Sequence, residues 1–149
     1  MPEINSSIIV FFDADALIAG SASREGASFI LLHLSELGLI HGFTCQKVVE
    51  ECHKNLLIKL PDAQPAFEKI LTTALTITEN PSKQEIMNYE KMADEKDLPI
   101  LIAALKTNAQ FLVTFNIKDF FPDPSLGLEV LKPGDLLKRI RTRLRELAN

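Results

Sequence analysis

The chain has 149 residues, a length that predicts one domain spanning residues 1–149. Its composition, 46% hydrophobic and 24% charged, is ordinary for a soluble globular protein. The apolar run at residues 8–12 is too short to span a membrane, and no basic segment precedes it as in a signal peptide. We therefore expect a cytoplasmic protein with no membrane partner.

The net charge of −4 argues by itself against a nucleic-acid partner, but the charge is unevenly distributed. Residues 132–145 contain six basic residues and one acidic residue, a local charge of +5 that leaves −9 for the rest of the chain. Such an asymmetry predicts an acidic site and a separate basic surface.

Strands and helices alternate along the chain. The first element is an apolar strand at residues 4–12, followed by a short helical turn at 14–19 that Gly20 is expected to end. The next helix, 25–37, is expected to end at Gly38. The remaining elements are strand 39–44, helices 46–60 and 63–75, strand 74–78, helices 83–93 and 98–108, strands 110–114 and 128–131, and a final helix at about 134–147.

This alternation predicts an α/β fold with a mainly parallel sheet covered by helices on both faces. Ligands of such folds bind beyond the carboxyl ends of the strands. Cys45 and Cys52 are expected to be free thiols, because on one helix they would be separated by roughly 10.5 Å of rise, too far for a disulfide.

Acidic residues stand at several ends of the predicted elements. Asp13 directly follows the first strand, and Asp97 opens an apolar helix, although each could instead cap the helix that follows it. Glu50 and Glu51 lie on helix 46–60, where a solvated glutamate is the ordinary alternative. Asp15 is a further capping candidate.

Polar residues also follow strand 110–114. Thr114 ends this strand, and Asn116 and Asp119 come shortly after it, where turn chemistry is the alternative explanation. Asp94 and Glu95, ahead of Asp97, are interpreted as solvated charges. If the acidic segments converge, their carboxylates would repel one another unless a divalent cation such as Mg²⁺, which prefers oxygen ligands, lay between them.

Four segments, in this order and spacing, resemble the PIN-domain family: FFDADALIAG, VVEECHKNL, KDLPILIAAL and LVTFNIKDF. The resemblance extends from residue 8 to about residue 137. It implies a compact three-layer α/β/α sandwich and Mg²⁺- or Mn²⁺-dependent ribonuclease activity on RNA. Members are often the toxin of a toxin–antitoxin pair, so the resemblance also implies an antitoxin partner and a homodimer.

The resemblance also assigns roles to individual acidic residues. Asp13 matches the first acid of the family, Glu51 the second, with Glu50 as the alternative, and Asp97 the third. All three are expected to bind the metal, and metal-activated water would then attack phosphorus.

Residues after the fourth strand match the family less closely. Thr114 matches a strand-end Ser or Thr that positions a ligating carboxylate or the water. Asn116 stands where many members have a fourth aspartate, and this departure leaves Asp119 to supply the missing charge as a metal ligand. Asp15 stands where many members have Asn or Ser near the metal.

The final helix has an apolar stripe that is expected to dock on the domain and basic residues on its other faces. These basic residues are explained by a solvated helix end, by contacts with RNA phosphates, or by an acidic partner. The RNA-binding candidates are Lys138, Arg139, Arg141, Arg143 and Arg145.

Three functions agree with these features. The first is a metal-dependent endoribonuclease, and the second is a catalytically weak or inactive PIN-like domain that binds RNA or protein. The third is a phosphotransferase of the haloacid dehalogenase type, since Asp13 and Asp15 form an Asp-x-Asp pair after a buried strand. A P-loop enzyme is excluded because the chain has no Gly-Lys-Ser/Thr phosphate loop.

Overall fold

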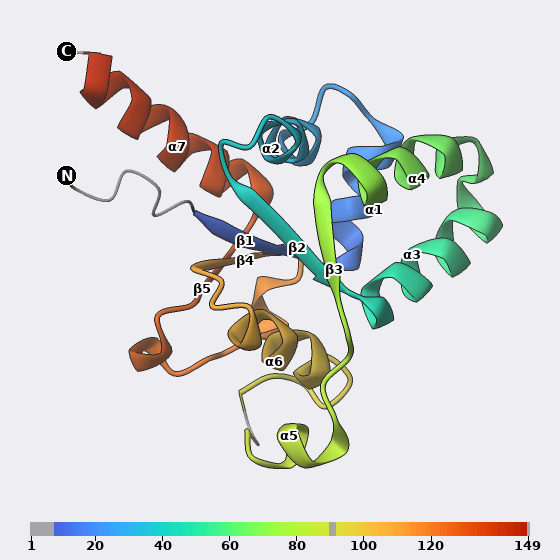
Figure 1. The fold of residues 1–149 in the computed structure, drawn as a ribbon, viewed down its shortest axis with the longest axis vertical. Helices are drawn as coiled ribbons and strands as arrows, with labels where there is room; N and C mark the ends of the chain where they lie inside the picture. The colour runs from blue at the N-terminus through green and yellow to red at the C-terminus, as the bar shows by residue number, and fades with distance from the viewer. Residues whose placement is uncertain (1–7, 90–91, 149) are drawn as a thin grey trace.

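The computed structural model describes residues 8–89 and 92–148. Its centre is a sheet of five parallel strands in the order β3-β2-β1-β4-β5 (Figure 1). The expected mainly parallel sheet is therefore confirmed. The strands are β1 (Ile9–Phe12), β2 (His41–Cys45), β3 (Leu75–Thr78), β4 (Phe111–Val113) and β5 (Glu129–Leu131).

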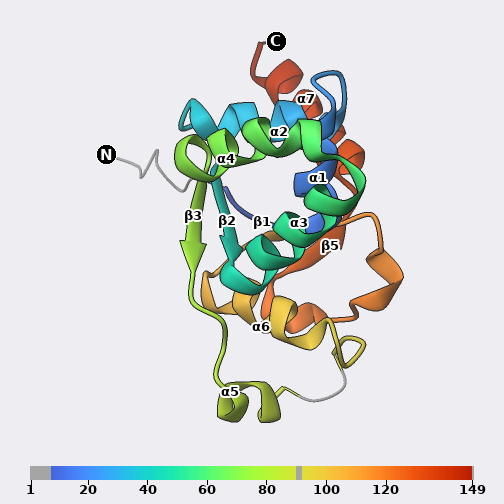
Figure 2. The same ribbon diagram turned by 90° about the vertical axis from the view of Figure 1, so that its right-hand side faces the viewer.

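Helices cover both faces of this sheet, which gives the expected three-layer sandwich. Helices α2, α3 and α4 pack against α1, and α7 packs against α2. Helix α6 packs against β2 and α5 (Figures 1 and 2). The helices are α1 (Ala14–Ala22), α2 (Ala27–Glu36), α3 (Gln46–Lys59), α4 (Gln64–Thr73), α5 (Lys83–Met87), α6 (Leu98–Lys106) and α7 (Pro133–Ala148). Short 3₁₀ turns lie at Pro61–Ala63, Ile117–Asp119 and Pro124–Leu126.

The central strand β1 lies in the middle of the hydrophobic core. Val10, Phe11 and Phe12 are fully buried, as expected for a parallel strand that is covered on both faces. Helix α6 is apolar almost all round and buries residues on several of its faces, which is typical of a helix inside a protein.

The chain reverses its direction of winding at the centre of the sheet. Strand β1 has β2 on one side and β4 on the other, so the carboxyl ends of β1 and β4 border a topological switch point. Two backbone hydrogen bonds continue the strand pairing beyond the carboxyl ends of β1 and β4. The Asp13 N–H donates to the Val113 carbonyl at 3.0 Å, and the Thr114 N–H donates to the Leu131 carbonyl at 3.2 Å. Asp13 and Thr114 are thereby fixed side by side.

Most predicted boundaries shift by a few residues, and residues 4–7 of the predicted first strand lie outside the described part of the chain. Two further differences concern where helices end. Gly20 does not end the first helix but lies inside α1, where a Cβ atom would approach Leu32 Cδ1 of α2 to 2.6 Å. Its lack of a side chain serves close helix packing rather than termination. The helix predicted at 83–93 ends at Met87, and residues 90 and 91 lie outside the described part of the chain.

Other local predictions agree with the structure. Gly38, at a φ of +81°, lies just after α2 and ends this helix as expected. The Leu39 N–H donates to the Leu34 carbonyl at 2.9 Å. Cys45 and Cys52 are free thiols. Within residues 8–89 and 92–148, no helix has the length and apolar character needed to cross a bilayer.

Gly42 of β2 offers a test of the packing between the sheet and α2. A Cβ atom there would lie 2.9 Å from the Ala74 carbonyl oxygen and 2.8 Å from Ser35 Oγ, and Ser35 Oγ already accepts the Gly42 N–H at 2.9 Å. We expect Gly42→Ala to lower the free energy of unfolding by about 2–3 kcal/mol, measured by urea denaturation. Gly134→Ala is the control, because nothing lies within 4 Å of its Cβ position. Equal stability of both variants would contradict this packing.

Candidate metal centre

A pocket of about 170 Å³ opens at the carboxyl ends of the central strands. Its lining comes from the residues after β1, from α3, from the segment before α6 and from the residues after β4. The structure thus brings together six of the residues singled out in the sequence at or near a metal site. The lining residues are Asp13, Asp15, Lys47, Glu51, Lys96, Asp97, Asn116 and Asp119.

Asp13 is the most deeply buried carboxylate of the pocket, with 6% of its surface exposed. Its Oδ1 accepts the Ala14 N–H at 2.8 Å, so the residue does cap α1, and its Oδ2 accepts the Thr114 hydroxyl at 2.8 Å. Burial raises the pKa of Asp13 to about 7, with the charge of Asp15 adding to the effect. Both sequence interpretations of Asp13, cap and pocket carboxylate, are consistent with this geometry.

Asp15 binds the loop that follows β4. Its Oδ2 accepts the Phe115 N–H at 3.0 Å and the Asn116 side-chain amide at 3.2 Å, and Thr114 Oγ1 lies 3.3 Å away. The Asn116 N–H in turn donates to Thr114 Oγ1 at 3.1 Å. Burial raises the pKa of Asp15 as well. One hydrogen-bonded unit therefore joins the starts of α1 and of the loop after β4.

Helix α3 brings a glutamate to the pocket. Its buried face, formed by Val48, Cys52 and Leu56, packs inward, and Cys52 Sγ lies 3.7 Å from the Ala14 carbonyl oxygen at the start of α1. Both Glu50 and Glu51 are exposed, but only Glu51 lines the pocket. The geometry therefore agrees with Glu51 rather than Glu50 as the pocket acid.

Two acids of the pocket lining, Asp97 and Asp119, form a cluster with Asp94, which is not part of the lining. Asp94, Asp97 and Asp119 each place one carboxylate oxygen within 4.8 Å of the other two. An antiparallel bridge between Ala93 and Phe120, and an Asp94 N–H bond to the Asp119 carbonyl at 2.9 Å, bring their segments together. Asp94 was interpreted as a solvated charge, and it is exposed, but its spacing three residues before Asp97 is the signal that was missed.

Asp97 does not use its side chain to cap α6, so the capping alternative is wrong for this residue. Its Oδ2 atom is buried and has no hydrogen-bond partner among the described residues. Burial raises the pKa of Asp97, an effect partly offset by the positive charge of Lys96. Burying a carboxylate oxygen without a hydrogen-bond donor lowers the stability of the folded state unless a cation or a water molecule binds the oxygen. This atom therefore suits a metal ligand.

Two lysines of the pocket were not singled out in the sequence. Lys47 lies one helical turn before Glu51 on α3, and Lys96 directly precedes Asp97. Among the residues that the structure describes, neither forms an ion pair. The spacing of Lys47 and Glu51 at i and i+4 on the predicted helix could have indicated that both share one wall.

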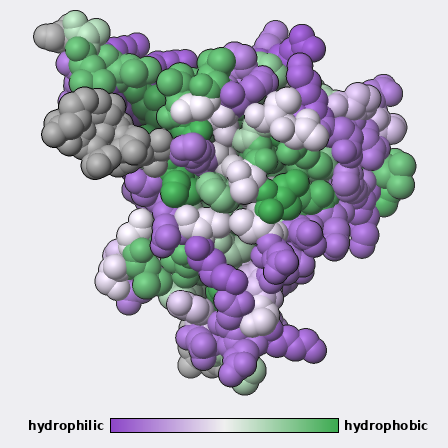
Figure 3. All heavy atoms as spheres, viewed as in Figure 1, coloured by the Kyte–Doolittle hydropathy of each residue, from purple (hydrophilic) through white to green (hydrophobic). Residues whose placement is uncertain are grey.

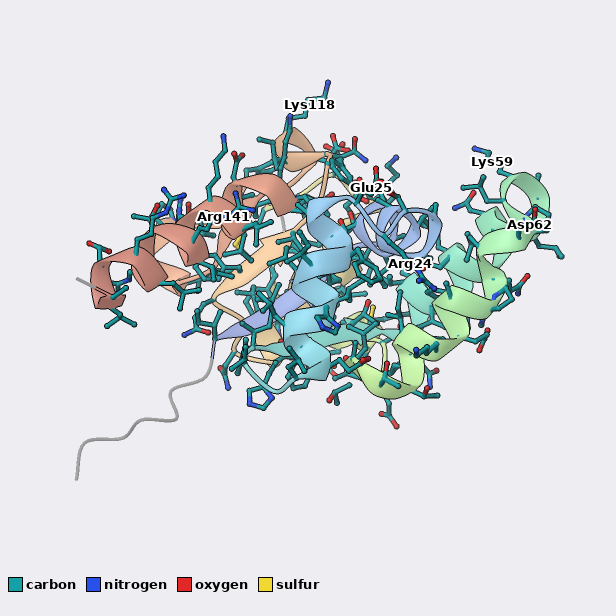
Figure 4. The ribbon with its side chains drawn as sticks, turned by 90° about the horizontal axis from the view of Figure 1, so that it is seen from above. Arg24, Glu25, Lys59, Asp62, Lys118 and Arg141 are labelled. Atoms are coloured by element: carbon teal, nitrogen blue, oxygen red, sulfur yellow. The ribbon has the colours of Figure 1, made fainter. Side chains whose placement is uncertain are left out.

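The basic helix lies away from this pocket. In Figure 1, α7 lies beside α2 and extends to the upper left of the molecule, whereas α6 lies below the sheet. Arg139 forms two hydrogen bonds with Glu129 of β5 and so ties α7 to the sheet. The other four basic candidates are exposed: Lys138, Arg141, Arg143 and Arg145. Lys118, by contrast, extends into solvent from the Ile117–Asp119 turn near the pocket (Figure 4).

The apolar stripe of α7 docks only in part. Leu136 is buried, but Leu144 and Leu147 are 59% and 83% exposed, so the expected docking of the whole stripe is wrong for the last turns. Figure 3 shows apolar atoms gathered over this end of the molecule.

The pocket has the chemistry of a site for a hard divalent cation, since its lining offers several carboxylate oxygens and no sulfur or imidazole. The donor set suits Mg²⁺ or Mn²⁺. Among the described residues, the acids that place ligand oxygens within 4.8 Å of one another in a group of three are Asp94, Asp97 and Asp119. Asp13 and Glu51 line the same pocket as Asp97 and Asp119 but are not part of such a group.

Comparisons with known proteins concern the fold and the family of the chain. A crystal structure of VapBC2 from Rickettsia felis bound to a DNA fragment from their promoter matches with a TM-score of 0.60 and 21% identity, over 83% of this chain and 98% of that chain. At this identity the likeness concerns the fold. No curated protein sequence matches. The family model of the PIN domain (PIN_3) matches residues 9–118. This chain therefore belongs to the PIN-domain family.

Proposed function

We propose that this protein is a metal-dependent endoribonuclease that hydrolyses phosphodiester bonds of RNA. The observation that carries the proposal is the convergence of carboxylates from four separate segments on one small pocket. One of them, Asp97, has a buried oxygen with no donor in the part of the chain that the structure describes. Carboxylates so placed repel one another and some stay protonated unless a cation binds between them. Bound Mg²⁺ or Mn²⁺ would supply a Lewis acid that activates water and stabilises charge on the phosphate.

The residues of the chain have separate tasks in this proposal. Asp13, Glu51, Asp97 and Asp119 hold the ion. Thr114 holds Asp13 Oδ2 by its hydroxyl group at 2.8 Å and so fixes the orientation of that carboxylate. Asn116 holds the loop after β4 through its contact with Asp15.

Partners of the protein are also proposals. RNA is the substrate by this account, and the basic residues of α7 are candidates for phosphate contacts outside the pocket. An antitoxin and a homodimer follow from the family resemblance, and the similar VapBC2 structure agrees with a protein partner. We further propose that the protein acts in the cytoplasm as one domain.

Substitution of the pocket acids tests the activity. Asp13→Asn and Asp97→Asn each remove a metal-ligand charge at nearly constant size, and we expect each to lower the rate of Mn²⁺-dependent cleavage of a mixed RNA substrate by more than about 100-fold. Glu50→Gln, on the same helix as Glu51 but outside the pocket, is the control and should cleave at the wild-type rate. Cleavage that survives both substitutions would show that the pocket is not the active site. A wild-type chain that cleaves nothing would favour the non-catalytic alternative.

The raised pKa of Asp13 predicts how stability depends on pH and metal. Without metal, the folded state holds one more proton than the unfolded state between about pH 4 and pH 7, so the free energy of unfolding should fall as the pH rises through this range. The loss would be on the order of 4 kcal/mol for this shift. Because a cation stabilises the ionised carboxylate, saturating Mg²⁺ should stabilise the protein more at pH 8 than at pH 5.

Urea denaturation in EDTA and in Mg²⁺ at several pH values measures both effects. Asp13→Asn should remove most of the pH dependence found in EDTA. The same slope in wild type and variant would assign the pH dependence to other groups.

A further inference from the structure

An amide–carboxylate contact joins two segments at the pocket. Asn116 Nδ2 donates to Asp15 Oδ2 at 3.2 Å, and both residues line the pocket. Asp15 belongs to the first turn of α1, and Asn116 follows β4. The contact therefore connects the two chain segments that flank the buried Asp13.

This pair carries a single negative charge, because the amide of Asn116 is neutral. The charge lies on Asp15, two residues after Asp13, and the carboxylates of both residues line the pocket. The charge of Asp15 therefore lies near the carboxylate that is proposed to bind the metal. Asp15 Oδ1 lies 3.4 Å from Thr114 Oγ1, the same hydroxyl that binds Asp13.

Asp119, expected from the sequence to supply the charge that Asn116 lacks, lines the same pocket as Asn116. Its carboxylate is close to those of Asp94 and Asp97. No hydrogen bond joins the side chains of Asp119 and Asn116 in the described residues. The acid that contacts Asn116 is Asp15.

We propose that Asp15 is a positioning residue of the metal centre, that it supplies the negative charge next to Asn116, and that this charge can occupy either position of the pair. The inference rests on the proposed function, because it assumes that the pocket binds a divalent cation. Exchange of the two residues conserves the charge and leaves one amide able to donate to one carboxylate.

A purely structural role for Asp15 makes a different prediction. Asp15→Asn keeps a side-chain oxygen that can accept the Phe115 N–H, so the loop contact survives while the charge is lost. If Asp15 only holds the loop, this variant should bind a divalent ion as well as the wild type does. If the charge matters, the variant should bind it more weakly.

Calorimetric titration with Mn²⁺ at pH 7.5, together with RNA cleavage by the same preparations, tests the inference. We expect Asp15→Asn to weaken Mn²⁺ binding about tenfold, as outer-sphere substitutions commonly do. The double variant Asp15→Asn/Asn116→Asp should restore the affinity to within about threefold of the wild type. Asp62→Asn removes an exposed acid from the Pro61–Ala63 turn, away from the pocket, and is the control (Figure 4).

Each other outcome has a defined meaning. If Asp15→Asn binds Mn²⁺ with wild-type affinity, the proposed role of the Asp15 charge is wrong. If the double variant binds Mn²⁺ no more tightly than Asp15→Asn does, the proposal that the charge can occupy either position is wrong. If Asp15→Asn does not fold, the comparison of the double variant with the wild type decides, and failure of the double variant to fold would overturn the inference. The expected affinities without RNA cleavage would refute only the nuclease proposal. No Mn²⁺ binding by the wild type would overturn both.

Discussion

The burial of Asp13 beside other carboxylates is the constraint on which the rest of the site depends. The residue directly follows the central strand, its backbone N–H continues the pairing of β1 with β4, and its side chain accepts two hydrogen bonds. Two donors lower the cost of burying the carboxylate but do not remove it, since its pKa remains raised to about 7. The fold thus holds an acid where ionisation is unfavourable without a neighbouring positive charge.

The parallel sheet explains how distant segments reach this point. Strands β1 and β4 are neighbours in the sheet but about 100 residues apart in the chain, so the Thr114 hydroxyl can bind Asp13. Helix α3 reaches the same edge because it starts where β2 ends, and the bridge between Ala93 and Phe120 brings in the last two acids. Backbone hydrogen bonds and core packing therefore support the pocket, and the carboxylates of Asp13 and Asp15 add hydrogen bonds from Thr114, Phe115 and Asn116.

Much of the fold was predictable because local signals agreed with the tertiary structure. Apolar strands, Gly38 and the periodicity of α3 identified most elements, and the order of the acidic segments identified Asp13, Glu51 and Asp97, which line one pocket. Gly20 was misinterpreted because a glycine inside a tightly packed helix has the same local signal as one that ends a helix. Lys96 was missed as a lining residue because its place there depends on tertiary contacts, whereas Asp94 and Lys47 were missed although their spacing from Asp97 and Glu51 was visible in the sequence.

Asn116 illustrates how a substitution can be interpreted differently once its neighbours are known. In the sequence it suggested a weakened site, with Asp119 as the compensating acid. In the structure its amide faces Asp15, and an aspartate at position 116 would face that carboxylate without a donor. The pair Asp15 and Asn116 is thus electrostatically consistent, which single-residue comparison could not reveal.

The central claim is that the carboxylates meet in order to hold a divalent cation. An anomalous difference map from crystals grown with MnCl₂ tests it most directly. This account predicts a peak in the pocket, within bonding distance of carboxylate oxygens of Asp13 and Asp97. A well-ordered pocket with no peak, or a peak only at a site elsewhere on the molecule, would contradict it.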